Sequence, residues 1–517
     1  MTADSQTSAP APAAPARPRS PIAIGRAPAR TLSVALLAIA IALGAWLRFA
    51  AIGAREMSAD EGASWAAAAA PNLAEVVRIQ AVLNPGKLAV YEVVLHGWMI
   101  LFGDGLGAMR SLSAMLDMLS IVVVFVLVRE LLNSRSSARS STPQSEHENA
   151  VPGGIPSAEA ETVAALAALF FTVNLVTIKY ARELRMYPLA LLIVLLQVWF
   201  FIRAVRRGSR SDLVPLAALT ALAVGVHFSA AFMIVTEAPC LAALPRMLRR
   251  RARVSAILPP FAIAAALGAG AALFLIVALP ALRTGASAFA HGATGWIERP
   301  RWWAPLALFN KGVGSFAFPV MAALAGWGTW RGWLRARAAT AFALAWMWLP
   351  PLLMLVASYA FSPMFVERYA LWCFVPFFML AALGAWELPS ASMRAAAIGL
   401  AVALALGHLH AYGQRPHDTQ WREAARAAAG ALAPGMKIAV APPYAINVMR
   451  YYLRDTQFAG TAVPADGSDA GDSDTNVLVV DDQWNAREEA AKLLAQYPHP
   501  LAGFRGVRVY GRGTRAQ

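Results

Sequence analysis

The sequence predicts a mainly α, polytopic helical membrane protein that ends in a small α/β domain. Of its 517 residues, 58% are hydrophobic and only 15% are charged, and the mean hydropathy is +0.51. This balance is typical of multi-span membrane proteins and excludes an ordinary soluble globule. Apolar runs recur along residues 31–411, and beyond residue 411 the composition changes to that of a soluble module.

The net charge of +15 does not indicate a nucleic-acid partner. The basic residues stand in short clusters between apolar segments, a pattern that reports topology and contact with the anionic headgroups of a lipid bilayer. The two cysteines, Cys240 and Cys373, lie within apolar runs. They have neither a disulfide framework nor metal-ligand spacing, so we expect both to be packing residues.

Eleven apolar segments are predicted to span the bilayer, each near the roughly 20 residues that a crossing requires. They are residues 31–52, 108–129, 162–178, 187–203, 213–228, 229–245, 254–280, 303–326, 339–360, 368–386 and 394–411. We expect residues 1–30 to form a disordered cytoplasmic tail. The first outer loop, residues 53–107, contains the apolar piece Leu88–Phe102, which is interrupted by Glu92 and His96 and is predicted to be an interfacial helix.

The placement of arginines supports this count. With the N-terminus inside, the arginine-rich loops all fall on the cytoplasmic side, as the positive-inside rule expects. These loops carry Arg129, Arg135, Arg139, Arg203, Arg206, Arg207, Arg210, Arg246, Arg249, Arg250, Arg251, Arg253, Arg331, Arg335, Arg337 and Arg394. Counting the Leu88–Phe102 piece as a full span would invert all of them. Because the number of spans is odd, residues 412–517 are predicted to lie on the extracytoplasmic side of the membrane.

The C-terminal segment reads as a small α/β domain. Short apolar runs at Met436–Val440 and Val477–Val480 predict buried strands. Helical patterns occupy Trp421–Leu432, Ala445–Leu453 and Ala486–Gln496.

A pair of acids, Asp60-Glu61, follows the first span closely, on its outer side. Carboxylates at a membrane boundary are costly to desolvate and therefore point to function. Chemistry on a molecule held in the lipid is the interpretation that this position favours.

Three further outer segments carry charge beside aromatic residues. In Lys179–Pro188, Glu183 stands between Arg182 and Arg185; either the arginines hold a phosphate, or the segment is a self-paired helix end anchored by tyrosines. In Ser362–Tyr369, Arg368 either binds phosphate or snorkels beside Glu367. Lys87 either contacts a phosphate or anchors a helix to headgroups. His227, at the outer end of the fifth span, is interpreted as a packing residue rather than a ligand.

The order of these motifs resembles the GT-C superfamily of integral-membrane glycosyltransferases. The bacterial branch related to protein O-mannosyltransferases and lipid A aminoarabinose transferases is the most similar, over roughly residues 30–455. Its members share an outer Asp-Glu pair, an Asn-Pro-Pro-Leu-like segment and a Tyr-x-x-Glu-x-Arg-Met-Tyr segment. The matching positions here are Asp60-Glu61, Asn84–Leu88, Tyr180–Tyr187, Pro363…Arg368-Tyr369 and Trp421–Ala425. Gly86-Lys87 departs from the family pattern, which commonly has a second proline, and adds a positive charge.

The resemblance implies an inverting glycosyltransferase that takes a sugar from a polyprenyl-phosphate donor. The sugar would go to a hydroxyl of a cell-envelope lipid, polysaccharide or protein. Asp60 would be the general base, and Glu61 and Glu183 would orient the acceptor or hold a divalent cation. Donor and phosphate contacts would come from Lys87, Arg182, Arg185, Tyr187, Arg368 and Tyr369. The Ala- and Arg-rich composition favours the bacterial inner membrane.

Two other classes of function remain open at this stage. A transporter or flippase of lipid-linked sugars would carry buried charges inside its spans and a repeat between its halves, and neither is expected here. A sensor that binds a ligand with its outer domain would explain residues 412–517 but not the clusters around Asp60 and Glu183.

Overall fold

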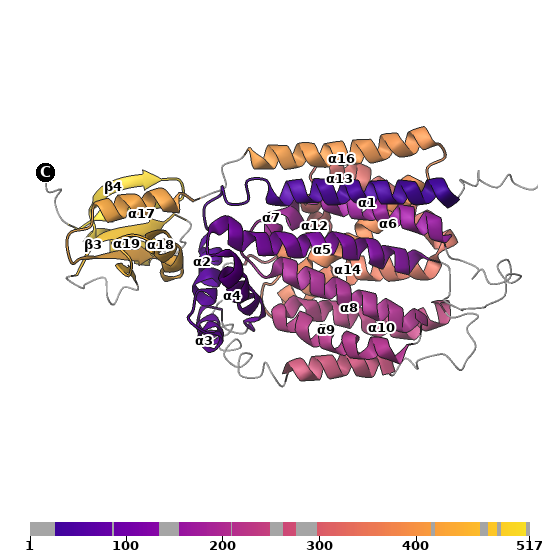
Figure 1. Cartoon of the computed structure of the whole chain (residues 1–517), viewed down its shortest axis with the longest axis horizontal. Helices are drawn as coiled ribbons and strands as arrows, with labels where there is room; N and C mark the ends of the chain where they lie inside the picture. The colour runs from indigo at the N-terminus through magenta and orange to yellow at the C-terminus, as the bar shows by residue number, and fades with distance from the viewer. Residues whose placement is uncertain are drawn as a thin grey trace, which may run out of the picture.

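The computed structural model describes residues 26–84, 87–133, 155–207, 209–248, 262–275, 297–414, 419–465, 474–482 and 487–512. These residues form a long bundle of roughly parallel helices, with a small sheet domain beyond one end (Figure 1). Helices α2 (Ala59–Ala68), α3 (Leu73–Leu83) and α4 (Val90–Phe102) lie between the two. The end of the bundle that they cover is called the α2 end below. Most of the predicted N-terminal tail lies outside the described residues.

The described helices confirm a polytopic fold and occupy every one of the eleven predicted positions. Within the described residues, six helices are long and apolar enough to cross a membrane, or up to eight if each of two bent pairs is one span. The six are α1 (Arg26–Phe49), α5 (Leu106–Leu132), α8 (Tyr187–Arg207), α14 (Arg337–Ala360), α15 (Phe374–Trp386) with the preceding η5 (Glu367–Cys373), and α16 (Ala391–Gly413).

The remaining positions hold shorter or bent helices. Shorter apolar helices include Val90–Phe102, the predicted interfacial piece, and also Phe228–Leu241 and Ala262–Leu275. The fifth predicted span is α9 (Leu213–Val226), and α10 (Ala231–Leu248) continues from Phe228–Ala230. The pair α6 (Ser157–Thr172) and α7 (Leu175–Ala181) bends by 64°, where the Asn174 side chain caps α7 by accepting from the Thr177 amide.

The predicted span 303–326 is occupied by two helices and not by one continuous helix. The chain forms α12 (Ala304–Val313) and α13 (Ala317–Arg335), which meet at 112°. Gly314 stands at the break with φ +87°, a conformation that costs glycine little. A Cβ there would lie 2.2 Å from the His408 ring. Only together are the two helices long and apolar enough to count as one crossing.

Small residues let the bundle pack closely. Where α13 crosses α15, a Cβ on Gly328 would lie 1.9 Å from the Leu380 carbonyl oxygen. A Cβ on Gly384 would lie 1.9 Å from the Leu324 carbonyl oxygen. Close backbone approach through small residues is a common way for membrane helices to associate.

The expectation that the spans lack buried charge is also wrong. Arg48 of α1 donates to Asp117 of α5 over 2.6 Å, and both side chains are almost fully buried. The buried Gln197 of α8 donates to the buried Glu237 of α10 over 2.8 Å. Each charge has a polar partner from another helix, which is how ionisable groups are tolerated in such a bundle.

The opposite end of the bundle gathers the arginines, as the topology predicts; it is called the arginine end below. Arg207 pairs with Glu130 at 2.8 Å. Arg335 pairs with Glu159 at 2.7 Å and also contacts Glu387. These pairs join α8 to α5, and α13 to α6 and to the segment after α15.

The C-terminal segment is the predicted α/β domain. Its five-stranded sheet has the order β2-β1-β3-β5-β4, with β2, β1 and β3 parallel and β5 and β4 antiparallel. The strands are β1 (Lys437–Ala441), β2 (Ala462–Pro464), β3 (Thr475–Asp481), β4 (His499–Phe504) and β5 (Val507–Gly511). Helices α17 (Trp421–Gly430), α18 (Ile446–Leu453) and α19 (Arg487–Gln496) match the predicted ones. The strands β2, β4 and β5 were not predicted.

Candidate active site

The predicted site residues gather at the α2 end, where four segments meet. The start of α2 brings Asp60, the segment before α4 brings Lys87, and the link between α7 and α8 brings Glu183 and Arg185. The fourth segment, η5, brings Arg368 and Tyr369. These residues span more than 300 positions of the chain, from Asp60 to Tyr369, and the bundle brings them to one end of the molecule.

Local chemistry fixes the start of α2. Ser58 accepts a hydrogen bond from the Glu61 amide, and the Glu61 carboxylate accepts one from the Ser58 amide over 2.9 Å. This reciprocal capping box satisfies two amides that a helix start would otherwise leave unpaired. Asp60 therefore lies in a defined first turn of α2.

Glu61 is committed to structural contacts. It is 2% exposed and accepts from Arg110 of α5 at 2.7 and 2.8 Å. It also accepts from the Leu184 amide over 2.8 Å. These contacts favour a positioning role for Glu61 over the predicted catalytic one.

Arg110 was missed by the sequence analysis. Besides Glu61, it donates to the carbonyl oxygens of Ile52, Arg55 and Glu56. It thereby fixes the turn between α1 and α2 to the first helical turns of α5. A lone arginine near the start of an apolar run was the available signal.

Asp60 faces cations while staying open to solvent. Its side chain is 61% exposed, and the Arg185 Nη2 lies 3.9 Å from its Oδ2. Arg185 also donates from Nη1 to the Asp60 carbonyl oxygen over 2.8 Å. The Arg185 guanidinium lowers the pKa of Asp60 against the effect of burial, with further lowering from Arg368, Lys87 and Lys179. The carboxylate is therefore ionised at neutral pH.

Buried donors and aromatic rings surround Arg185. It is 5% exposed, and its Nε has no hydrogen-bond partner among the described residues. Tyr187 lies beneath the guanidinium carbons of Arg185 and Arg368, 5.9 and 5.6 Å from the ring centre. Tyr369 contacts Arg368 at 5.7 Å and the His227 ring at 4.5 Å. His227 packs among these rings, as predicted, and its Nδ1 bonds the Ser229 hydroxyl.

Lys87 completes the cationic side. Pro85-Gly86, part of the segment predicted to lead to it, lie outside the described residues. Burial lowers the pKa of Lys87 to about 8, helped by Arg185 and opposed by Asp60 and Glu92. Glu92 of α4 is 3% exposed, and burial raises its pKa.

Arg182 does not reach this group. It donates to the carbonyl oxygens of Leu47 and Ala51 at the end of α1, over 3.0 and 3.3 Å. Because carbonyls at a helix C-terminus lack intrahelical partners, Arg182 satisfies a structural need there. The geometry does not support the predicted contact with substrate.

Glu183 lies half-buried beside the site. Burial raises its pKa to about 7, Lys179 lowers it, and Glu61 and Asp60 raise it further. Above pH 7 the charged form costs the folded state free energy.

We expect Glu183→Gln to be more stabilising, relative to wild type, at pH 8 than at pH 5. The folded state holds the Glu183 proton more tightly than the unfolded chain, so wild type loses stability as pH rises toward 7. Thermal unfolding at both pH values measures this difference. Glu75→Gln is the control, because Arg78 lowers the pKa of exposed Glu75 and reverses the sign. Parallel pH profiles for Glu183→Gln and wild type would contradict this assignment.

The predicted acids do not assemble a metal site. No group of three His, Cys, Asp or Glu side chains in the described ranges is placed to hold a metal ion. Glu61 is occupied by Arg110, and Asp60 faces cations. These contacts give no support to a divalent cation at Asp60, which stays a prediction.

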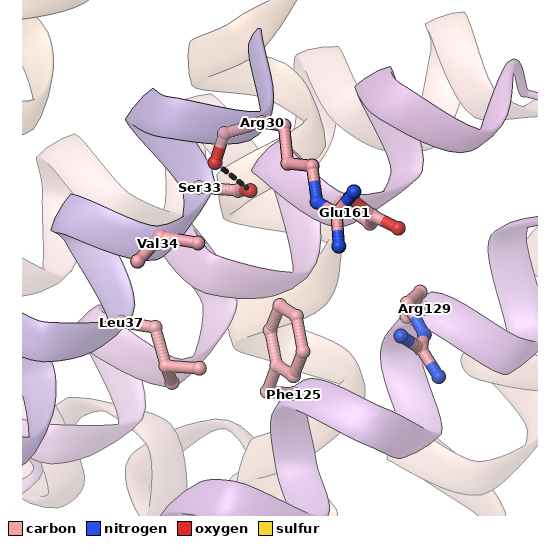
Figure 2. A pocket seen from close by; sticks show the side chains of 7 residues that line it. All are labelled: Arg30, Ser33, Val34, Leu37, Phe125, Arg129 and Glu161. Atoms are coloured by element: carbon pink, nitrogen blue, oxygen red, sulfur yellow. Dashed lines mark hydrogen bonds between the residues drawn. The ribbon is translucent and has the colours of Figure 1, made fainter. Parts of the chain in front are cut away.

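A separate hollow lies at the arginine end (Figure 2). Its volume is about 180 Å³, and it is lined by Arg30, Ser33, Val34, Leu37, Phe125, Arg129 and Glu161. Residues 30–49 of α1 separate it from the α2 end, a length of roughly 30 Å at 1.5 Å per residue. It is therefore no part of the Asp60 site.

No family model and no curated protein matches this sequence. Solved structures do match over nearly the whole chain. ArnT from Cupriavidus metallidurans in the apo state has a TM-score of 0.55 at 13% identity, covering 94% of this chain and 98% of that one. The same protein bound to undecaprenyl phosphate has a TM-score of 0.54 at 12% identity, covering 93% and 98%.

A more distant match is the apo oligosaccharyltransferase of Archaeoglobus fulgidus. Its TM-score is 0.50 at 11% identity, and the match covers 94% of this chain and 75% of that one. This chain therefore shares its overall fold with ArnT and with the oligosaccharyltransferase.

Proposed function

We propose that this chain is a membrane glycosyltransferase that moves a sugar from a polyprenyl-phosphate donor to a hydroxyl of a cell-envelope acceptor. The observation that carries the proposal is Asp60, an exposed carboxylate at the α2 end whose Oδ2 lies 3.9 Å from the Arg185 guanidinium and whose pKa is lowered by Arg185, Arg368 and Lys87. A base beside a cationic cluster suits a reaction that takes a proton from one substrate and releases a phosphate from the other. The fold shared with ArnT, which has been solved with undecaprenyl phosphate, supports the same class of donor.

In the proposed reaction the acceptor hydroxyl oxygen attacks the anomeric carbon of the donor sugar. Asp60 takes the hydroxyl proton while the new C–O bond forms. The bond between the anomeric carbon and the phosphate oxygen breaks, and its electron pair leaves with polyprenyl phosphate. An ionised carboxylate also stabilises positive charge that develops on the sugar ring. Attack opposite the leaving group inverts the anomeric centre.

The cations neutralise the departing phosphate. The Arg185 Nε is buried, has no hydrogen-bond partner in the part of the chain that the structure describes, and offers a hydrogen bond to phosphate oxygens. The Arg368 guanidinium contacts the rings of both Tyr187 and Tyr369. Charge stabilisation by preorganised groups is usually the largest catalytic term.

We expect binding of the donor phosphate to raise the pKa of Asp60. Arg185, Arg368 and Lys87 lower the pKa of Asp60, and a bound phosphate offsets the charge of the same groups. Asp60 becomes a stronger base when the donor is in place. The free enzyme thus keeps Asp60 ionised, and the donor complex makes it fit for proton transfer.

The proposal predicts an alkaline limb governed by Lys87. Above pH of about 8 Lys87 loses its proton, so we expect kcat/KM for the donor to fall there in wild type. Lys87→Arg keeps the charge and moves this limb to higher pH. Lys87→Ala lowers kcat/KM about tenfold or more at pH 7, because a hydrogen bond to a charged group is lost.

Release of polyprenyl phosphate from a synthetic polyprenyl-phosphate sugar measures this effect. Lys437→Ala, which removes an exposed lysine of the C-terminal domain, is the control and leaves the profile unchanged. An unshifted limb in Lys87→Arg would remove Lys87 from the donor site.

For the cellular setting we propose a bacterial inner membrane with the arginine end in the cytoplasm. The ion-paired arginines at that end follow the positive-inside rule. Asp60 and the C-terminal domain then lie on the extracytoplasmic side.

A transporter of lipid-linked sugars is the second candidate, because charges are buried between helices. Arg48 pairs with Asp117, and Gln197 pairs with Glu237, each across two helices. Buried pairs of this kind also occur where they only hold helices together. They are therefore weaker support for a transporter than Asp60 is for a glycosyltransferase. The two candidates differ in whether the donor is consumed.

A further inference from the structure

The hollow at the arginine end lies where three helices reach the end of the bundle (Figure 2). Arg30 is the first residue of the apolar stretch Arg30–Phe49 of α1, and Arg129 lies in the last turn of α5. Glu161 belongs to the second turn of α6. Because the ends of spanning helices lie near the lipid headgroups, we expect these three charged groups to lie at that level.

The lining of the hollow is polar toward the end of the bundle and apolar toward its middle. Arg30 stands one helical turn before Val34 on α1, and Arg129 stands one turn beyond Phe125 on α5. The Phe125 ring centre lies 5.8 Å from the Arg129 guanidinium carbon, and Val34 is 61% exposed on the outer surface of α1. A phospholipid has the same order of groups, with a charged headgroup at the surface and acyl chains beneath it.

The charged groups of the hollow have no charged partner in the described part of the chain. Among the seven lining residues, Figure 2 shows one hydrogen bond, from the Ser33 hydroxyl to the Arg30 carbonyl oxygen. The side chains of Arg30, Arg129 and Glu161 make no hydrogen bond or ion pair with another described residue. Two guanidinium groups and one carboxylate therefore leave one positive charge for a ligand to balance.

The size of the hollow also fits a headgroup. Its volume is about 180 Å³, whereas sites that enclose a whole small molecule measure roughly 300–1,000 Å³. A headgroup needs less room, because the rest of its molecule stays in the bilayer. Basic hollows between membrane helices are a recurring kind of headgroup site.

We propose that this hollow binds one phospholipid of the phosphatidylglycerol type, with a singly charged phosphate and an uncharged headgroup that carries hydroxyls. The phosphate accepts charge-assisted hydrogen bonds from Arg30 and Arg129. The headgroup hydroxyls donate to Glu161, and an acyl chain packs on the apolar lining. This lipid brings the charge of the site to zero, whereas a zwitterionic lipid leaves one positive charge unbalanced. The bound lipid joins α1 to α5 and α6.

Native mass spectrometry of the full chain in detergent tests this site. Phosphatidylglycerol, phosphatidylethanolamine and phosphatidylcholine are added singly at equal concentrations. Wild type is expected to bind one phosphatidylglycerol about fivefold more tightly than either zwitterionic lipid. Arg30→Gln and Arg129→Gln are each expected to weaken that binding about fivefold, the loss typical of one basic group near a lipid surface. Preference for phosphatidylethanolamine would assign Glu161 to an ammonium group and overturn the proposal.

Two variants separate the hollow from general effects of charge. Arg337→Gln removes an arginine of the same end that contacts the Trp333 ring at 4.7 Å and does not line the hollow. We expect it to leave lipid binding unchanged. Glu161→Gln removes a negative charge beside the phosphate and is expected to strengthen binding. Equal losses in Arg337→Gln and Arg129→Gln, or weaker binding in Glu161→Gln, would contradict the assignment to this hollow.

A second readout tests whether a lipid, rather than a free anion, occupies the hollow. Phosphatidylglycerol is expected to raise the Tm of wild type, because a ligand that binds the folded state stabilises it, and to raise the Tm of Arg129→Gln less. Inorganic phosphate at the same concentration is expected to leave the Tm unchanged, and an equal rise with phosphate would overturn the lipid assignment. Neither measurement uses a sugar donor or acceptor, so both results stand whether or not the proposed function holds.

Discussion

Asp60→Asn is expected to lower kcat by ~10² or more, the range typical of a lost general base. Asparagine keeps the shape of the side chain, and the Arg185 bond to the residue 60 carbonyl oxygen remains. The variant should therefore fold and bind donor with a KM close to that of wild type. Steady-state release of polyprenyl phosphate, with donor and acceptor varied separately, measures both constants.

The matched control for Asp60→Asn is Glu75→Gln. It neutralises an exposed acid of α3 in the same outer region, paired only with its neighbour Arg78 among the described residues, and we expect an unchanged kcat. Full activity in Asp60→Asn would contradict the base assignment. Glu183, whose pKa of about 7 is close to a working pH, would then be the group to substitute next.

Arg110→Met is expected to destabilise the fold by ~3–5 kcal/mol, the loss typical when one partner of a buried ion pair is removed. Both side chains of the Arg110–Glu61 pair are 2% exposed. The variant leaves the Glu61 charge buried and frees three carbonyl groups of the α1–α2 turn. Reversible denaturant unfolding in detergent, followed by tryptophan fluorescence, measures the free energy of unfolding.

Arg454→Met is the control for this prediction, since it makes the same substitution in an open ion pair. Arg454 and Asp104 are 24% and 46% exposed, and such pairs contribute about 0–1 kcal/mol. Adding Glu61→Gln to Arg110→Met should recover part of the loss, because the unpaired charge is removed. Equal effects of Arg110→Met and Arg454→Met would show that burial of the pair is not decisive.

Local sequence carried the prediction of the site's first turn. The apolar run that ends near Ile52 and the Ser58…Glu61 spacing together specify a spanning helix followed by a capped one. Nothing local specified that Glu61 is neutralised by Arg110, 49 residues away. The sequence predicted that the Asp60-Glu61 pair is functional. Which of the two acids is free to react and which one is bound by Arg110 depends on helix packing, which the local sequence does not specify.

For the same reason, the sequence did not predict that Arg182 and Arg185 make different contacts. They are three residues apart, which would place them on one face of a helix. Residues 182–186 are not helical, so Arg182 turns to the end of α1 and Arg185 to Asp60. No periodicity rule applies to such a link.

Hydropathy was enough to predict the positions of the membrane helices. The bends within them depend on single turn residues and were not predicted. Gly314 and Asn174 are turn-favouring residues inside apolar runs, and each lies at a bend between two helices. Strands β4 and β5 could have been found from the alternation Val507-Arg508-Val509-Tyr510 after Gly506. Buried pairs such as Arg48–Asp117 join distant segments and have no local signature.

The most direct test of the proposed function is the fate of a radiolabelled polyprenyl-phosphate sugar in proteoliposomes that hold the purified chain. With a cell-envelope extract as acceptor, we expect label to pass to the acceptor and polyprenyl phosphate to accumulate, and we expect Asp60→Asn to abolish both. Intact donor that has moved between leaflets, with no label on acceptor and no polyprenyl phosphate released, would contradict the account and establish a transporter.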